Sequence, residues 1–157
     1  KSPKPIARLI ESIELDLSKI ADAIKDYYGG ENLNIKLAEA GYSVKVALSE
    51  IALESIVKSL ISHAYVHGGP DVSVEVDFGT VPVQGEMLKI TITDSGVGIP
   101  EEEKESVFEE FFTTRRDMVA GGMGLPSVRQ LLEIHSGSID LLTNRKGATF
   151  LIRIPVF

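Results

Sequence analysis

The sequence predicts a two-layer α/β sandwich, with a mixed, mainly antiparallel sheet and with helices on one of its faces. Short stretches of alternating apolar and polar residues recur along the chain, and each indicates a strand with one covered and one exposed face. Longer stretches with a helical period lie between these strands. Because only one face of such a sheet is covered, we expect all helices to lie on the same side of it.

Size, composition and charge narrow the class of protein. The chain has 157 residues, 43% of them hydrophobic and 25% charged, so one globular domain with a sizeable core is expected. The net charge of −7 argues against a nucleic-acid binder, which would need a basic face. The absence of cysteine excludes disulfides and thiolate metal sites and is compatible with a cytoplasmic location. We expect no membrane segment and no signal peptide in this chain.

The N-terminal region carries a heptad-like pattern that leaves three interpretations open. Its apolar residues are spaced alternately by four and three: Ile6, Ile10, Ile13, Leu17, Ile20, Ile24 and Tyr27. This is typical of a helix packed on its own domain, or of the tail of a dimerising helix that enters from a neighbouring domain. Alternatively, Asp16 or Ser18 caps a new helix after a short extended segment. We assign residues 1–12 to a linker or to the tail of a dimerisation helix, and residues 13–157 to one folded domain.

The central part of the chain predicts two short strands and a long helix. Residues 35–37 and 44–48 alternate between apolar and polar, with Gly41 at the turn between them. From residue 49 to residue 67 the apolar residues follow a helical period, and Ser49 is a suitable N-cap.

The C-terminal part predicts a strand pair joined by a hairpin loop, a short acidic helix, a polar loop, a further helix and two final strands. These elements cover residues 71–78, 88–92, 100–110, 113–124, 126–135, 138–142 and 149–155. Pro100 and Pro126 suit the first turns of the two helices. The last helix is expected to turn Leu131, Leu132 and Ile134 towards the core.

The segment most informative about chemistry is Asp94-Ser95-Gly96-Val97-Gly98-Ile99-Pro100. An apolar strand delivers the Asp94 carboxylate at its end, where it can accept a hydrogen bond from an exocyclic amine. Gly96 and Gly98 let the backbone pass close to a flat ring. The alternative is a plain turn between a strand and a helix.

A second glycine cluster, at residues 121–124, runs directly into the helix that Pro126 opens. Backbone amides and the dipole at a helix N-terminus favour an anion, although the spacing matches neither common phosphate-binding glycine motif. Arg115 and Arg116 precede the cluster and can neutralise a phosphate. Without such a ligand, the cluster is a flexible loop tip and the two arginines are solvated.

His63 and His67 lie four residues apart in the stretch ISHAYVHGG, so a helix places both rings on one face. A metal site, a catalytic pair and two polar residues at a helix end are all compatible with this spacing. Zinc requires three or four ligands, and no glutamate or cysteine partner stands in a recognisable pattern. We therefore disfavour a zinc site.

Four motifs, in this order, resemble those of the ATP-binding catalytic domain of sensor histidine kinases, within the wider group of gyrase, HSP90, histidine kinase and MutL ATPases. They are DSGVGIP, VFEEFFTT, GGMGLPSVRQLLEIHSGSI and KGATFLIRIP. The resemblance extends from about residue 13 to the end of the chain. It implies the Bergerat-type fold of this group, which is the α/β sandwich already predicted from periodicity.

The resemblance also implies a set of nucleotide-binding residues. Asp94 would read the adenine amino group, Gly98 would line the ring, and Thr149 would help to hold a water bound to adenine. Gly122 and Gly124 would be lid glycines near the phosphates. With the two arginines and two apolar wall residues, the predicted cofactor-binding set is Asp94, Gly96, Gly98, Ile99, Arg115, Arg116, Gly122, Gly124, Leu125 and Thr149.

The stretch with the two histidines departs from the family pattern, which has two asparagines four residues apart. Ser59 stands at the first of these positions and His63 at the second, which makes them the candidate catalytic residues; Val66 replaces a frequent lysine. In the family the second asparagine offers an oxygen to Mg²⁺, so His63 is also the candidate metal ligand. An imidazole is a poor ligand for Mg²⁺, and an unassisted serine hydroxyl is a poor base.

Two functions of different classes follow. The first is a kinase domain that uses ATP and Mg²⁺ to transfer a phosphoryl group to a histidine on a separate dimerisation domain, with a response regulator as the further partner. We expect a homodimer only for the full-length protein, and a cytoplasmic location, which includes the cytosolic part of a membrane-bound sensor. No histidine is followed by an acidic residue, so the chain alone should not complete the transfer. The second function is a degenerate, non-catalytic nucleotide-binding or docking module of the same fold.

Overall fold

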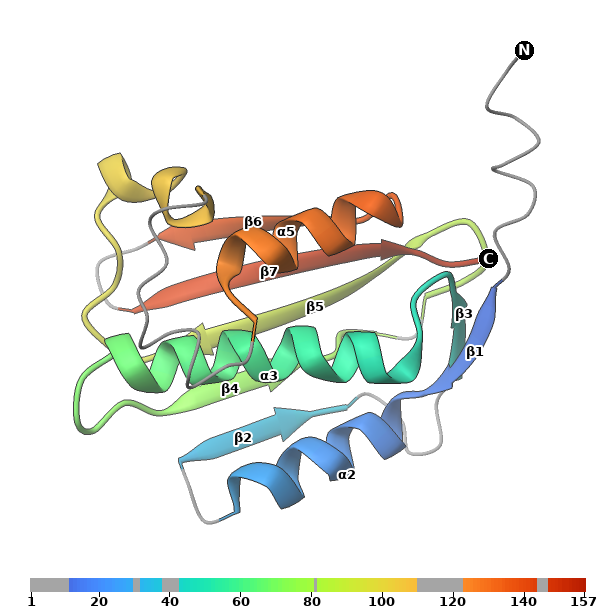
Figure 1. Cartoon of the computed structure of the whole chain (residues 1–157). Coiled ribbons are helices and arrows are strands. Elements are labelled where there is room, and N and C mark those ends of the chain that lie inside the picture. Colours follow the sequence, from blue (N-terminus) through green and yellow to red (C-terminus); the bar gives the residue numbers. More distant parts are fainter. Residues whose placement is uncertain (1–11, 30–31, 38–42, 81, 110–122, 144–146) are drawn as a thin grey trace.

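The structure is a computed structural model that describes residues 12–29, 32–37, 43–80, 82–109, 123–143 and 147–157 (Figure 1). In chain order its elements are β1 (Ile13–Asp16), α2 (Leu17–Tyr28), β2 (Leu33–Lys36), β3 (Ser43–Val46), α3 (Glu50–His67), β4 (Val74–Asp77), β5 (Met87–Asp94), two 3₁₀ turns (Glu101–Glu103 and Ser106–Phe108), α5 (Leu125–Ile134), β6 (Ser138–Thr143) and β7 (Ala148–Pro155). Within these described ranges, no helix combines the length and the apolar character that crossing a membrane requires.

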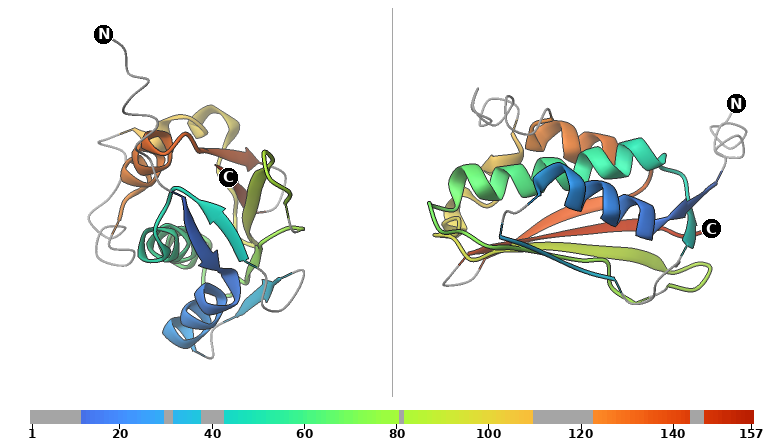
Figure 2. Two further views of the ribbon diagram at one scale, coloured as in Figure 1. Left: turned by 90° about the vertical axis from the view of Figure 1, so that its right-hand side faces the viewer. Right: turned by 90° about the horizontal axis from the view of Figure 1, so that it is seen from below.

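The main sheet has five strands in the order β2-β4-β5-β7-β6. β2 runs parallel to β4, whereas the other neighbouring strands are antiparallel. The helices α2, α3 and α5 lie together on one face, and the described part of the chain leaves the opposite face open (Figure 2). The predicted two-layer sandwich with a mixed, mainly antiparallel sheet is thus confirmed.

Residues along the central strands alternate between the core and the open face. Ile90 and Ile92 on β5, and Phe150 and Ile152 on β7, are buried beneath the helices. Burial of each such side chain stabilises the fold by about 1.5–3 kcal/mol. The same alternation turns Asp94, the last residue of β5, towards the helical layer. The strand pattern therefore delivers a carboxylate to the inner face of the sheet.

The helix α3 lies between α2 and α5 and forms the middle of the helical layer (Figure 1). Ser49 is its N-cap, as predicted, and its hydroxyl oxygen accepts a hydrogen bond from the Ala52 amide at 3.1 Å. Its apolar stripe is fully buried: Leu53, Ile56, Val57, Leu60, Ile61 and Ala64. This packing fixes the rotation of the helix and thereby the direction of its polar residues.

The heptad-like pattern of the N-terminal region is not one continuous helix. Residues Ile13–Asp16 form the strand β1, which pairs antiparallel with β3 in a separate two-stranded sheet. Asp16 then caps α2, because its carboxylate accepts a hydrogen bond from the Ser18 amide at 2.9 Å. Of the three interpretations, the new helix after an extended segment is confirmed. The division of the chain at residue 12 stays a prediction, because residues 1–11 lie outside the described ranges.

The two short strands before α3 were expected to adjoin each other at a turn, but they belong to different sheets. β2 pairs with β4 at the edge of the main sheet, and β3 pairs with β1. Periodicity indicates that a segment is a strand and not which strand it joins, so this pairing could not be predicted locally. Gly41, the expected turn residue, lies outside the described residues.

Two further expectations about helices need correction. The acidic segment after Pro100 forms two 3₁₀ turns and no regular helix. In a helix, Glu101 and Glu105 would be like charges one turn apart, which destabilises that conformation. On α5, Ile134 is 65% exposed while Leu132 is fully buried, because two positions along a helix rotate a side chain to the far side.

Candidate functional site

Asp94 is the charged residue at the centre of the candidate site. Its side chain is only 9% exposed, and its Oδ1 accepts a hydrogen bond from the Gly96 amide at 2.8 Å. Burial raises the pKa of Asp94 above its ordinary value of 3.8, while hydrogen bonds from the backbone amides of Gly96 and Ala148 lower the pKa in part. These two amides occupy part of the capacity of a carboxylate, which offers about four lone-pair sites. Asp94 can therefore accept a further donor from a ligand.

Glycines allow three chain segments to meet around Asp94. A side chain at Gly96 would collide with the backbone of Gly68, which directly follows α3. Gly147 has a φ of +74°, and a side chain there would collide with the carbonyl oxygen of Asp94. The loop after β5, the end of α3 and Gly147, directly before β7, thus pack backbone against backbone. Gly96 allows the loop after β5 to pack against the end of α3, whereas its predicted approach to a ligand ring stays a prediction.

A small cavity opens beside the carboxylate. It is lined by His63, Ala64, His67, Gly68, Asp94, Gly98, Ile99 and Ala148. Its volume of about 20 Å³ has room for about one water, which needs about 10–15 Å³ on this measure. A flat base can therefore enter only after a wall moves. The structure brings together His63, Asp94, Gly98 and Ile99 of the predicted site.

The two histidines form one wall of this cavity. Their ring centroids lie 4.5 Å apart with the planes inclined by 38°. The His63 ring also meets the edge of the buried Phe150, at 5.7 Å between centroids and with nearly perpendicular planes. His63 is half-buried and His67 is exposed, so the pair reaches from the cavity wall to the surface. Among the described residues, no group of three or more histidine, cysteine, aspartate or glutamate side chains is arranged to hold a metal ion.

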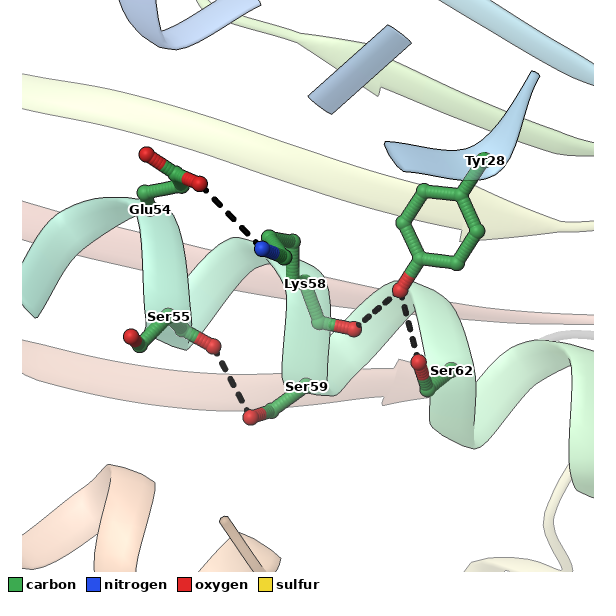
Figure 3. Close-up of polar contacts among 6 residues, drawn as sticks. All are labelled: Tyr28, Glu54, Ser55, Lys58, Ser59 and Ser62. Atoms are coloured by element: carbon green, nitrogen blue, oxygen red, sulfur yellow. Dashed lines mark hydrogen bonds and ion pairs between the residues drawn. The ribbon is translucent and has the colours of Figure 1, made fainter. Parts of the chain in front are cut away.

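Ser59 does not line the cavity, although it lies one turn before His63 on α3. It is 3% exposed, and its hydroxyl donates a hydrogen bond to the Ser55 carbonyl at 2.8 Å (Figure 3). Another side of the helix is tied to α2, since the Tyr28 hydroxyl bonds the Lys58 carbonyl at 2.7 Å and lies 2.6 Å from the Ser62 hydroxyl. Both arrangements give these hydroxyl groups a structural role.

Thr149 points away from the cavity. It pairs with Thr93 across β5 and β7, and the two hydroxyl oxygens lie 3.1 Å apart. The neighbouring pair, Asp94 and Ala148, faces the helices instead. The structure therefore does not bring Thr149 to the predicted water position. Ala148 was not predicted as a site residue. Its position could have been inferred from the sequence, because it lies two residues before the apolar Phe150 and so faces the same side of the strand.

The remaining predicted residues lie elsewhere or outside the described ranges. Gly124 is the N-cap of α5, and Leu125 is 4% exposed and packs in the core, so neither lines the cavity. Arg115, Arg116 and Gly122 lie outside the described residues, and their roles stay predictions.

A wider hollow of about 470 Å³ lies along β2, β4 and β5. Asn34, Glu75 and Thr93 belong to its lining and come from the open face of the sheet. Asp94 also borders this hollow. We place the candidate site in the smaller cavity, because among the described residues the carboxylate meets the glycine loop, an apolar side chain and the end of α3 there.

Comparisons with known proteins match this architecture. The model of the family described as "Histidine kinase-, DNA gyrase B-, and HSP90-like ATPase" matches residues 48–157. A probable sensor histidine kinase of Mycobacterium tuberculosis, TcrY, is 29% identical over 95% of this chain and 32% of its own length. The sensor histidine kinase YclK of Bacillus subtilis is 32% identical over 79% of this chain and 32% of its own length. The chain thus spans about a third of the length of these relatives.

Solved structures agree in fold. The catalytic domain of the histidine kinase ThkA superimposes with a TM-score of 0.77 at 20% identity, covering 92% of this chain and 95% of that chain. The mycobacterial sensor histidine kinase MprB gives a TM-score of 0.71 at 21% identity, covering 92% of this chain and 97% of that chain. At such identities the likeness concerns the fold alone.

Proposed function

Because the chain belongs to the family of histidine kinase-, DNA gyrase B- and HSP90-like ATPases, we propose that it is the ATP-binding catalytic domain of a two-component sensor histidine kinase. The observation that carries the proposal is the buried Asp94 carboxylate at a cavity closed by glycine backbone and by Ile99. An ionised carboxylate accepts hydrogen bonds only, which suits the exocyclic amino group of adenine. A base that lacks the amino group would leave the remaining acceptor capacity of this buried carboxylate unused, so it should bind more weakly.

The reaction is transfer of the γ-phosphoryl group of ATP to a histidine on a separate dimerisation domain. The three histidines of this chain are followed by alanine, glycine and serine, so none has the acidic neighbour of the family's acceptor. Two of them, His63 and His67, lie in the cavity wall, and His135 bonds the Leu131 carbonyl at the end of α5. The domain acts by positioning ATP for an acceptor outside this chain.

A response regulator is the proposed downstream partner. The related kinase ThkA has been solved in complex with the response regulator protein TrrA, and this chain superimposes on that kinase with a TM-score of 0.74. A cytoplasmic location follows from the same proposal, since both ATP and a response regulator would have to reach the domain.

One observation favours a second candidate function, a degenerate docking module. Ser59 lies outside the lining of the cavity, and His63 brings an imidazole to the cavity wall, so neither supplies an oxygen ligand to the cavity. Calorimetric titration with ATP, with and without Mg²⁺, tests the kinase proposal. Binding of ATP at micromolar to millimolar concentrations supports the kinase domain, and the absence of any adenine-nucleotide binding would exclude it.

A further inference from the structure

The described residues of the cavity do not fit Mg²⁺. This ion requires nearly octahedral oxygen coordination, whereas the side chains that α3 brings to the cavity wall are the imidazoles of His63 and His67. Ser59 has its hydroxyl on the Ser55 carbonyl and does not line the cavity. The remaining carboxylate, Asp94, accepts hydrogen bonds from the amides of Gly96 and Ala148, and its remaining capacity is assigned to the adenine amino group. The metal preference of this site must therefore differ from that of an oxygen-lined one.

The spacing of the histidine pair is compatible with two imidazole ligands of one metal ion. Residues four apart on a helix face the same side, and the ring centroids of His63 and His67 lie 4.5 Å apart. When two imidazoles bind one tetrahedral ion at metal–nitrogen distances of about 2.0–2.1 Å, their ring centres lie roughly 5 Å apart. Imidazole nitrogen suits zinc, cobalt, nickel and copper, and suits magnesium poorly.

Two ligands are too few for a self-sufficient site. Zinc sites use three or four protein ligands, and the described residues gather no group of three. A nucleotide can complete the coordination with phosphate oxygens. His67 is exposed and His63 half-buried, so the pair extends from the base cavity towards the surface, the direction in which the phosphates of a bound nucleotide must leave.

We propose that His63 and His67 bind a divalent transition-metal ion of the Co²⁺, Ni²⁺ or Zn²⁺ type, together with the phosphate oxygens of the bound nucleotide. The inference rests on the proposed function, since the nucleotide is itself part of the site. Metal and nucleotide then strengthen each other's binding by the same factor. The domain is selective for the metal–nucleotide complex that it accepts, and Mg²⁺ gives little or no such coupling.

Cobalt is the suitable probe, because its visible absorption reports imidazole ligation directly. ATP is titrated calorimetrically into the chain in chelator, in Mg²⁺ and in Co²⁺, and the Co²⁺ spectrum is recorded with and without ATP. We expect Co²⁺ to tighten ATP binding by about 5- to 150-fold, the usual range of coupling between two ligands. We expect Mg²⁺ to change the affinity for ATP less than twofold. A new Co²⁺ absorption band should appear only when ATP is present.

Three variants make the test specific. His63→Asn and His67→Asn should each abolish the band and the Co²⁺ effect; the second changes an exposed residue, so folding is not at risk. His135→Gln is the matched control, because His135 lies at the end of α5, outside the cavity lining, and it should keep both. Equal ATP affinity in chelator and in Co²⁺, a band that survives His67→Asn, or equal coupling by Mg²⁺ would each overturn the inference while leaving ATP binding in place. Failure of ATP to bind under every condition would instead overturn the proposed function.

Discussion

Replacement of Asp94 by asparagine tests two effects of its charge. One is the stability that is lost when the charge is buried, and the other is the contribution of the charge to ATP binding. Asp94 is 9% exposed, and Gly96 and Ala148 donate backbone hydrogen bonds to it. The pKa of Asp94 is raised above 3.8 in the folded chain, mainly by burial. The stability that comes from the neutral acid is therefore complete below pH 3.8 and is lost as the pH rises through the higher folded value. At pH 7 the charged form opposes folding.

Asp94→Asn should accordingly raise the unfolding temperature at pH 7 and lose this advantage at pH 3. The same change should weaken ATP binding, because a hydrogen bond to a charged group contributes about 1.5–3 kcal/mol, which corresponds to roughly 10- to 150-fold in Kd. Thermal unfolding and calorimetry measure the two effects on one sample.

Asp140→Asn is the control for this experiment. Asp140 pairs with Arg153 at 2.7 Å on the open face of the sheet, and both side chains are substantially exposed. Its substitution should leave ATP affinity unchanged. If Asp94→Asn also leaves ATP affinity unchanged, the assignment of Asp94 as the adenine-reading group is refuted. If it lowers the unfolding temperature at pH 7, the sign of the burial argument is wrong.

The remaining predictions concern the metal, the glycine contacts and the helix pair. His63→Asn should strengthen Mg²⁺-dependent ATP binding, because an amide oxygen replaces an imidazole nitrogen; unchanged Mg²⁺ dependence in calorimetry would mean that the residue does not face the metal position. Gly96→Ala should destabilise the fold by about 1–3 kcal/mol, since its methyl group would collide with the backbone of Gly68; denaturant unfolding with a wild-type midpoint would contradict this packing. Tyr28→Phe should cost about 1–2 kcal/mol of stability through the lost bonds to the Lys58 carbonyl and the Ser62 hydroxyl, with ATP affinity unaltered; a matching loss of affinity would show that the α2–α3 contact also supports the site.

Local patterns were sufficient wherever one residue type decides the structure. The alternation of Leu88, Ile90 and Ile92 identifies β5, and it carries Asp94 to the inner face without any knowledge of neighbouring strands. Ser49 marks the start of α3, because its hydroxyl satisfies a free amide of the first turn. These features are local, so a single sequence contains them.

Features that depend on distant partners could not be obtained in this way. The parallel pairing of β2 with β4 joins segments separated by the whole of α3. The contact of Gly68 with Gly96 joins the end of that helix to the loop after β5. No local pattern in either segment predicts this contact. Thr149 is a different case. It directly precedes the buried Phe150 on its strand and therefore faces the opposite side of the sheet, which already excludes it from the inner face.

The central claim is that adenine binds in the cavity beside Asp94, and amide chemical shifts of the ¹⁵N-labelled chain test it most directly. On addition of ATP, the largest shift changes should fall on Gly98, Ala148 and the last turn of α3, which line the cavity, and on Gly96, whose amide binds Asp94. Amides of β2 and of Glu75 on the open face should move little. Shift changes confined to the open-face hollow along β2 and β4, with Gly98 and Ala148 unmoved, would contradict the account.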